Sequence, residues 1–291
     1  MTAPPLVADL RTLLDEDPLD LARAALTIAR LEYPGLRAAA SLHTLDRIGA
    51  HARIRLRPLG RAPLRERVAL LNRIVFDEEG FTGNQRYYDD FRNSCLNVVI
   101  ERRLGIPITL ALVYMEIARR SGLVVHGVGF PGHFLMRVPD GRRADGSGDL
   151  ILDPFGGGAE IDPPACRALL ARQTGFESAA GPLDPALLRP CSARHMLARM
   201  LNNLKRTYVE LRSFPQARRV TDLLLTIDPT LISEVRDRGL LAYHLDDFPA
   251  ALRDLESYLR LSPKVDRPDR SEWRQVWDHV KTLRHRVASL N

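Results

Sequence analysis

The chain has 291 residues, of which 45% are apolar, so it is long enough for about two domains with sizeable cores. Its net charge is +6, but the basic residues are scattered along the chain beside acidic ones. They form no basic stripe with interleaved aromatic residues, which argues against nucleic-acid binding. The acidic N-terminus is unlike a secretory signal, and no apolar run approaches the length of a membrane span, so we expect a cytoplasmic protein without a membrane partner.

The first 80 residues are expected to form a helical lead-in. Asp17 is a candidate N-cap with Pro18 as the first helical residue, and Pro34 would end this helix. Two further helices are predicted over 36–54 and 64–76, with proline and glycine residues between them. We therefore assign residues 1–80 to a lead-in that packs on the following core.

Two helices are predicted next. Ser94 is a candidate N-cap for a helix that Gly105 would end. Pro107 suits the first position of a second helix, because its missing N–H would be unpaired there, and Gly122 would close that helix. Its apolar composition indicates a central, buried helix.

The pattern after Gly122 changes to short β-branched and alternating segments. Strands are predicted over 123–128, 133–138 and 150–152, forming an antiparallel sheet after the helix. Residues 81–180 are therefore expected to form an α+β core.

The C-terminal part, residues 190–291, is predicted to be helical with an internal repeat of 34 residues. This spacing resembles the tetratricopeptide repeat, in which two antiparallel helices pack closely. Only two repeats are recognisable, followed by an amphipathic segment that we expect to cap them. The coincident pairs are Leu211 and Leu245, Phe214 and Phe248, Pro215 and Pro249, Ala217 and Ala251, Leu225 and Leu259, and Pro229 and Pro263.

Four motifs of the middle part of the chain belong together. They are Arg92-Asn-Ser-Cys-Leu-Asn97, Glu101-Arg-Arg-Leu-Gly-Ile-Pro-Ile-Thr109, Gly129-Phe-Pro-Gly-His-Phe-Leu135 and Leu152-Asp-Pro-Phe-Gly156. With these motifs the chain resembles the bacterial SirB1 family, whose members are similar to transglutaminase-like domains with C-terminal tetratricopeptide repeats. The resemblance spans nearly the whole chain and implies an α+β fold, with a helical lead-in, a papain/transglutaminase-like core and then helical hairpins.

The wider superfamily implies a Cys–His–Asp triad, in which the imidazole activates a thiol and the carboxylate orients the imidazole. His133 and Asp153 match the last two members. A structural hydrogen-bonded pair is an equally good interpretation of these two residues. The cysteine position corresponds to Pro107, which offers neither a nucleophile nor a backbone N–H for an oxyanion.

Cys95 is the one candidate substitute, since it lies near the start of the preceding helix, where the helix dipole favours a thiolate. The alternative is that Cys95 is a small buried apolar residue, as most free cysteines are. Cys166 and Cys191 have no histidine motif beside them and are interpreted as structural. The odd cysteine count, without a CxxC pair, predicts no disulfide framework.

A polar cluster near the His–Asp pair is a further candidate binding site. Its members would be Asn93, Asn97, Glu101 and Arg102. The alternative is that Asn93 caps a helix while Glu101 and Arg102 are solvated. The histidines show no compact ligand pattern, so no metal or other cofactor is expected.

Three functions fit these features. The first is a non-catalytic transglutaminase-like protein that binds a protein or an extended peptide, using the groove near His133 and the concave side of the repeats. The second is a cysteine hydrolase or acyltransferase that uses Cys95 with His133 and Asp153. The third makes the repeats the functional part, with the core as a rigid platform.

Overall fold

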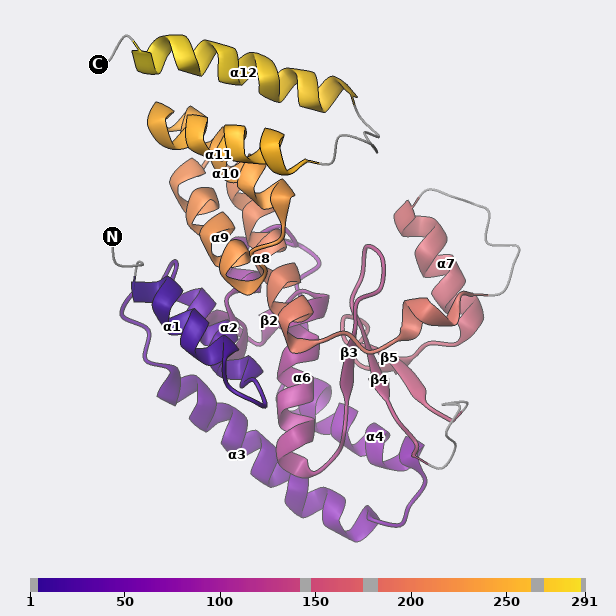
Figure 1. Ribbon diagram of the computed structural model, residues 1–291. Helices are drawn as coiled ribbons and strands as arrows, with labels where there is room; N and C mark the ends of the chain where they lie inside the picture. Colours follow the sequence, from indigo (N-terminus) through magenta and orange to yellow (C-terminus); the bar gives the residue numbers. More distant parts are fainter. Residues whose placement is uncertain (1–4, 142–147, 175–182, 263–269, 289–291) are drawn as a thin grey trace. The chain divides into compact units, whose positions relative to one another are not determined.

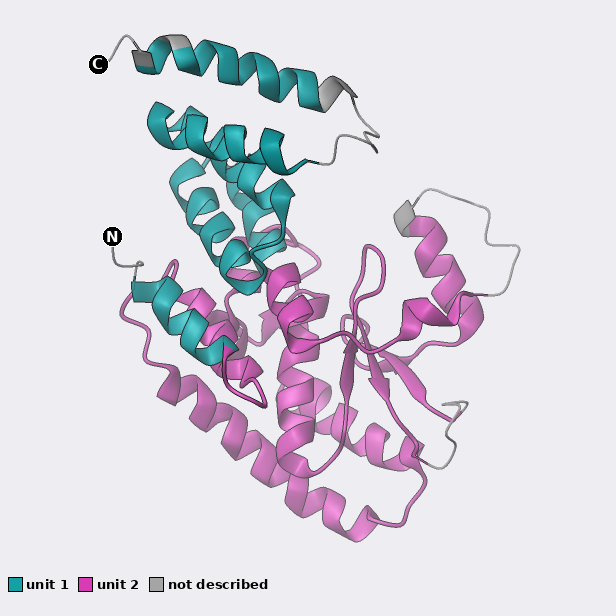
Figure 2. Ribbon diagram, viewed as in Figure 1, with its two compact units in different colours: residues 1–14, 201–291 teal, residues 15–200 magenta. Residues whose placement is uncertain are grey.

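The computed structural model describes residues 5–141, 148–174, 183–262 and 270–288 (Figure 1). The chain divides into two compact units, which are described separately (Figure 2). One unit comprises residues 15–200, and the other comprises residues 1–14 and 201–291.

The larger unit consists of helices around a small sheet. Its α-helices are α2 (Leu21–Ala29), α3 (Ala38–Leu56), α4 (Leu64–Asn72), α5 (Leu96–Arg102), α6 (Pro107–Ser121) and α7 (Pro163–Thr174). Shorter turns are η1 (Arg57–Leu59), η3 (Phe91–Ser94) and η4 (Pro185–Leu188), and η2 (Arg73–Glu78) is π-helical. The predicted α+β class is confirmed.

Helix α6 is the central element of this unit. Pro107 is its first residue and Gly122 its left-handed C-cap with φ 88°, as the sequence predicts. Most of its side chains are buried. Helix α3 packs along it, and the close approach requires a glycine, because a Cβ at Gly49 would collide with the side chain of Arg120. The packing of α3 on α6 therefore places the start of α6 at a defined point in the core.

Some helix ends differ from the prediction. The N-cap of α2 is Asp20, whose side chain accepts from the Arg23 amide, whereas Asp17 was the predicted cap. Cys95, not Ser94, is the N-cap residue of α5, because Ser94 closes the preceding 3-10 turn. Local side-chain capping preferences did not distinguish these neighbouring polar residues, since the adjoining turns decide which residue starts the helix.

The end of α5 also differs from the prediction. This helix ends at Arg102, its C-cap Arg103 has a left-handed backbone with φ 59°, and Gly105 instead pairs in a short strand. The strand is β2 (Leu104–Gly105), which lies parallel to β1 (Thr82–Gly83). The two strands connect the segment before α5 to the start of α6.

The main sheet is antiparallel, with the order β3, β4, β5, β6. Its strands are β3 (His126–Val128), β4 (Leu135–Val138), β5 (Leu150–Asp153) and β6 (Ala159–Glu160). The register pairs Val128 with Leu135 and Met136 with Leu152. The three predicted strands are present, although β4 starts at Leu135, so His133 lies in the turn before the strand. The two-residue strand β6 was too short to predict.

The smaller unit contains the predicted repeat. Its helices are α1 (Pro5–Leu14), the end of α8 (Ala193–Glu210), α9 (Phe214–Ile227), α10 (Ile232–His244), α11 (Phe248–Leu261) and α12 (Arg270–Ala288). Arg212 and Asp246, which are 34 residues apart, both have left-handed backbones with φ 54° and 56°. The next residues, Ser213 and Asp247, both donate from their amides to the end of the preceding helix. Equivalent turns therefore recur at the predicted spacing.

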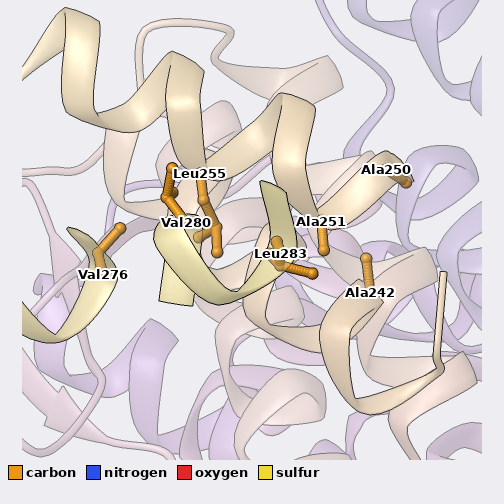
Figure 3. Close-up of a cluster of buried hydrophobic side chains, with 7 residues drawn as sticks. All are labelled: Ala242, Ala250, Ala251, Leu255, Val276, Val280 and Leu283. Carbon is orange, nitrogen blue, oxygen red and sulfur yellow. The ribbon is translucent and has the colours of Figure 1, made fainter. Parts of the chain in front are cut away.

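The last two helices of the repeat unit share an apolar core (Figure 3). Ala251 and Leu255 of α11 pack with Val276, Val280 and Leu283 of α12, and each is 2% exposed or less. This is the amphipathic final helix that the sequence predicts. Helix α1 packs on α9 in the same unit.

Candidate functional site

The N-terminus of α6 is tied to the segment before α5 by a buried hydroxyl group. Thr109 Oγ1 accepts a hydrogen bond from the Ile106 amide over 3.1 Å and donates to the Asn93 carbonyl over 2.8 Å. Pro107, the first residue of α6, lies in sequence between Ile106 and Thr109. The first position of α6, where the sequence predicts the superfamily nucleophile, is therefore occupied by a proline ring that has neither a thiol nor a backbone N–H donor.

His133 and Asp153 form the hydrogen bond that the sequence predicts. The distance between His133 Nε2 and Asp153 Oδ1 is 2.9 Å, and the side chains are 10% and 21% exposed. Asp153 ends β5, and its Oδ1 also accepts from the Phe155 amide over 2.9 Å. The carboxylate therefore fixes both the imidazole and the turn that follows β5.

The environment of Asp153 favours the ionised carboxylate. Burial by itself raises the pKa of this carboxyl group, but other interactions outweigh it. The hydrogen bond and charge of His133, together with the amides of Phe155 and Gly156, hold the pKa below its ordinary value. An ionised Asp153 can orient the imidazole, which is the role of the carboxylate in a triad.

Arg199 of α8 holds the turn that carries His133. Its Nη1 donates to the Phe130 carbonyl over 3.1 Å, and its Nη2 donates to the His133 carbonyl over 2.8 Å. The guanidinium group also lies 5.4 Å from the centre of the Phe134 ring. Sequence reasoning missed Arg199, since one arginine on an amphipathic helix carries no local signal of a contact about 66 residues away.

An aromatic side chain links the His–Asp pair to the start of α6. The Phe155 ring lies edge-on to His133 and to Tyr88, with centroid distances of 6.4 Å and 5.8 Å. It packs against Gly83, where an added Cβ would be 2.5 Å from the ring. Because Gly83 pairs with Gly105, two residues before Pro107, the imidazole lies on the side of the core where α6 begins.

Asn93 organises the loop before α5. It is 1% exposed, and its Oδ1 accepts from Asn84 Nδ2 over 3.0 Å. Its Nδ2 donates to the carbonyls of Tyr87 and Tyr88 over 2.7 and 3.1 Å. These bonds hold the two tyrosines at the surface, where Tyr87 is 56% and Tyr88 39% exposed. All polar atoms of the Asn93 side chain are thus engaged within the protein.

Cys95 lies in an apolar cluster. It is 1% exposed and is packed among Ala29, Val98, Tyr33, Leu36 and Phe91. Burial raises the pKa of the Cys95 thiol to about 12, and the charges of Glu32 and Asp90 add to the effect. Loss of hydration therefore outweighs the helix dipole, and the thiol is neutral at physiological pH.

The remaining predicted polar residues lie along α5. Asn97 and Glu101 line a hollow of about 420 Å³ with residues of α3, and Asn97 Oδ1 is enclosed without a hydrogen-bond partner. Arg102 Nη1 lies 3.4 Å from Asp90 Oδ2. Among the described residues, the hydrogen bonds and ion pairs of the Asn93 and Arg102 side chains are made with Asn84, Tyr87, Tyr88 and Asp90, and not with His133 or Asp153.

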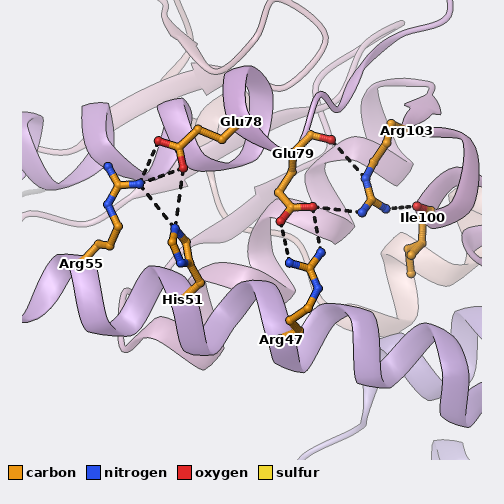
Figure 4. A network of polar contacts seen from close by, with 7 residues as sticks. All are labelled: Arg47, His51, Arg55, Glu78, Glu79, Ile100 and Arg103. Carbon is orange, nitrogen blue, oxygen red and sulfur yellow. Dashed lines mark hydrogen bonds and ion pairs between the residues drawn. The ribbon is translucent and has the colours of Figure 1, made fainter.

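A polar network beside this hollow includes Arg103, whose backbone is left-handed. Its guanidinium donates to the Glu79 carboxylate over 3.0 Å and to the carbonyls of Glu79 and Ile100 (Figure 4). Glu79 also receives two 3.0 Å hydrogen bonds from Arg47 of α3. The network connects α3, η2 and α5, and we assign it a structural role.

Two further features concern metals and membranes. Within the described ranges, no group of three or more His, Cys, Asp or Glu side chains is arranged to hold a metal ion. Among the helices of the same ranges, none has the length and apolar character needed to cross a membrane.

Comparison with known proteins defines the class of protein. Residues 39–202 match the family model of the transglutaminase-like superfamily, and residues 204–277 match that of the tetratricopeptide repeat. The chain belongs to the transglutaminase-like superfamily and carries tetratricopeptide repeats, a combination that supports a protein-interaction module.

The particular family follows from the relatives. A UPF0162 protein of Xylella fastidiosa strain Temecula1 is 39% identical over 268 residues, covering 91% of this chain and 92% of the relative, which places the chain in the UPF0162 family. Protein SirB1 of Salmonella typhimurium is 28% identical over 199 residues, covering 68% and 71%. The predicted relationship to SirB1 is confirmed.

Relatives of this domain also occur in eukaryotes. Human F-box only protein 21 is 29% identical over 186 residues, which cover 62% of this chain and 28% of that protein. The domain is therefore shared beyond bacteria.

Proposed function

We propose that the chain is a non-catalytic transglutaminase-like protein that binds an extended segment of another protein in the cytoplasm. The observation that carries this proposal is the state of the nucleophile. Pro107 begins α6, and Cys95 is enclosed with a thiol pKa of about 12. Neither Pro107 nor Cys95 therefore offers the His133–Asp153 pair a reactive thiol.

The proposed binding surface consists of Tyr87, Tyr88, Phe155 and His133, and we call it the aromatic row. Exposed tyrosines supply a large contact area at a low cost in conformational entropy, which suits recognition of a peptide. Arg199 and Asn93 hold the two ends of the row by hydrogen bonds to backbone carbonyls. A surface held in place in this way loses less entropy on binding than a mobile one.

The alternative function is a cysteine hydrolase or acyltransferase that uses Cys95 with His133 and Asp153. It requires a thiolate that an imidazole can reach. Burial of Cys95 among apolar side chains favours the non-catalytic proposal over this one. The third function, a platform role for the repeats, is supported by the repeat match at residues 204–277 and is compatible with peptide binding by the core.

The test uses a phage library of random 12-residue peptides that is selected on the full chain. Enriched peptides are synthesised, and their Kd values are measured by fluorescence anisotropy. We expect Tyr87→Ala to weaken binding by about tenfold or more, since an aromatic anchor contributes roughly 1–3 kcal/mol. Val124→Ala is the matched control, because Val124 is also 56% exposed but is not part of the aromatic row. Equal Kd values for both variants and the unmodified chain would refute the assignment of this surface.

A further inference from the structure

Three arginines surround a hollow in the larger unit, at the end of α6 opposite to the start that lies near His133. Arg53 and Arg57 come from the end of α3 and from η1, and Arg67 comes from α4. The hollow measures about 270 Å³ and is completed by Ser121, the last residue of α6, and by its C-cap Gly122. The ends of α3 and α6 lie in the lower part of the view in Figure 1, and α3 packs against both α6 and α4.

The positive charges at this hollow have no acidic partner. Arg53 and Arg57 are exposed and Arg67 is half-buried; in the described part of the chain none of the three forms an ion pair with a carboxylate, and no acidic residue lines the hollow. Arg67 Nε is enclosed by protein and makes no hydrogen bond. A buried donor without a partner costs roughly 1–3 kcal/mol, so the site is incomplete as it stands.

The spacing of two of the arginines adds repulsion. Arg53 and Arg57 are four residues apart on continuous helical backbone, so their side chains lie on one face, and like charges at this spacing destabilise a helix. On another face of α3 the chain arranges arginines differently. Arg47 pairs with Glu79, and Arg55 pairs with Glu78 at 2.8 Å (Figure 4). The unpaired group at the hollow is therefore a local departure from the pattern of this helix.

The end of α6 supplies only part of the missing negative charge. A helix C-terminus carries about half an elementary negative charge. The last carbonyls of α6 are already partly engaged, since the Gly122 and Leu123 amides donate to Arg119 and Ala118. The positive charge of three guanidinium groups is larger than the partial negative charge of the helix ends around them. The hollow is therefore left with a net positive charge.

We propose that this hollow binds a phosphate group. Guanidinium groups recognise phosphate through paired, charge-assisted hydrogen bonds, and three of them around a small cavity would neutralise a phosphomonoester. The same chemistry is offered by an anionic phospholipid headgroup, and exposed Ile54 and Val124, at 71% and 56%, adjoin residues of the hollow in sequence. The site is independent of the proposed function, because its residues are not part of the aromatic row.

The experiment is isothermal titration of the full chain with inorganic phosphate at pH 7.5, against sodium chloride of equal ionic strength. We expect saturable heat from phosphate alone. In the double variant Arg53→Gln/Arg57→Gln the Kd should rise by about tenfold or more. Arg61→Gln is the matched control, since Arg61 is exposed and close in sequence but does not line the hollow. Arg67 is kept, because replacing a partly buried side chain could unfold the protein, and circular dichroism checks the fold of each variant.

A second measurement separates the two sources of phosphate. Co-sedimentation uses vesicles of phosphatidylcholine alone or with phosphatidylglycerol. Binding to phosphatidylglycerol vesicles that is lost in the double variant but kept in Arg61→Gln would support the site, with a lipid as its ligand. Saturation by free phosphate without vesicle binding would support it with a soluble ligand. The proposal is overturned if the double variant matches the unmodified chain in both measurements, or if neither probe binds more than its control.

Discussion

The state of Cys95 can be tested by alkylation with iodoacetamide, comparing the folded chain with the chain unfolded in guanidinium chloride. Only the thiolate reacts. With a pKa of about 12, the native thiol is ionised in roughly one molecule in 10⁴ at pH 8, whereas an ordinary thiol with a pKa of about 8.5 is ionised in about a quarter. Ionisation alone therefore slows the native reaction by about 10³-fold, and the 1% exposure of Cys95 slows it further.

The assay is mass spectrometry of peptides after timed labelling between pH 7 and 10. The expected native rate at Cys95 rises about tenfold with each pH unit, because the thiolate fraction does so well below the pKa. Cys191 is the internal reference, since it is partly exposed and should react first in the folded chain. A Cys95 rate that levels off near neutral pH, or that equals the unfolded rate at pH 8, would refute the reasoning and favour a thiolate paired with an imidazole.

Three further predictions concern stability, measured as the free energy of unfolding in urea. Asp153→Asn should destabilise the chain at pH 7 and reduce the loss of stability on acidification. The pKa of Asp153 is lowered by folding, so its contribution is present above the ordinary carboxyl pKa and lost as pH falls through the folded value. Gly83→Ala should cost about 1–3 kcal/mol, because the new Cβ would collide with Phe155. Glu79→Gln should cost about 1–3 kcal/mol through weakened bonds to two guanidinium groups.

Matched controls exist for each of these variants. Asp77 is exposed, so Asp77→Asn should leave the pH profile unchanged. Gly35 has open space at its Cβ position, so Gly35→Ala should cost less than Gly83→Ala. Glu101 is exposed, so Glu101→Gln removes a carboxylate charge at the surface and serves as the control for Glu79→Gln. Its free energy of unfolding should stay within about 0.5 kcal/mol of that of the unmodified chain. If a control variant changed the free energy of unfolding, or its pH dependence, as much as its paired variant does, the structural explanation for that variant would be refuted.

The sequence alone determined the features that depend on local backbone chemistry. Pro107 and Gly122 mark the ends of α6, because a proline lacks the donor that a first helical turn leaves unpaired and a glycine adopts a positive φ. The 34-residue repeat was readable from residue types. The family resemblance of the motifs around His133 and Asp153 predicted their pairing, and the hydrogen bond between the two side chains is present.

Tertiary structure decided the features that depend on contacts between residues far apart in the sequence. The helix start at Cys95 favours a thiolate, but side chains from α2 and the segment after it enclose the sulfur, and the loss of hydration outweighs the dipole. Arg199 reaches the turn of His133 from a helix far along the chain. Phe155 fits against Gly83 only because β1 and β2 bring that glycine to the start of α6. Periodicity and capping signals extend over a few residues, whereas burial and charge pairing depend on which distant segments meet in the folded chain.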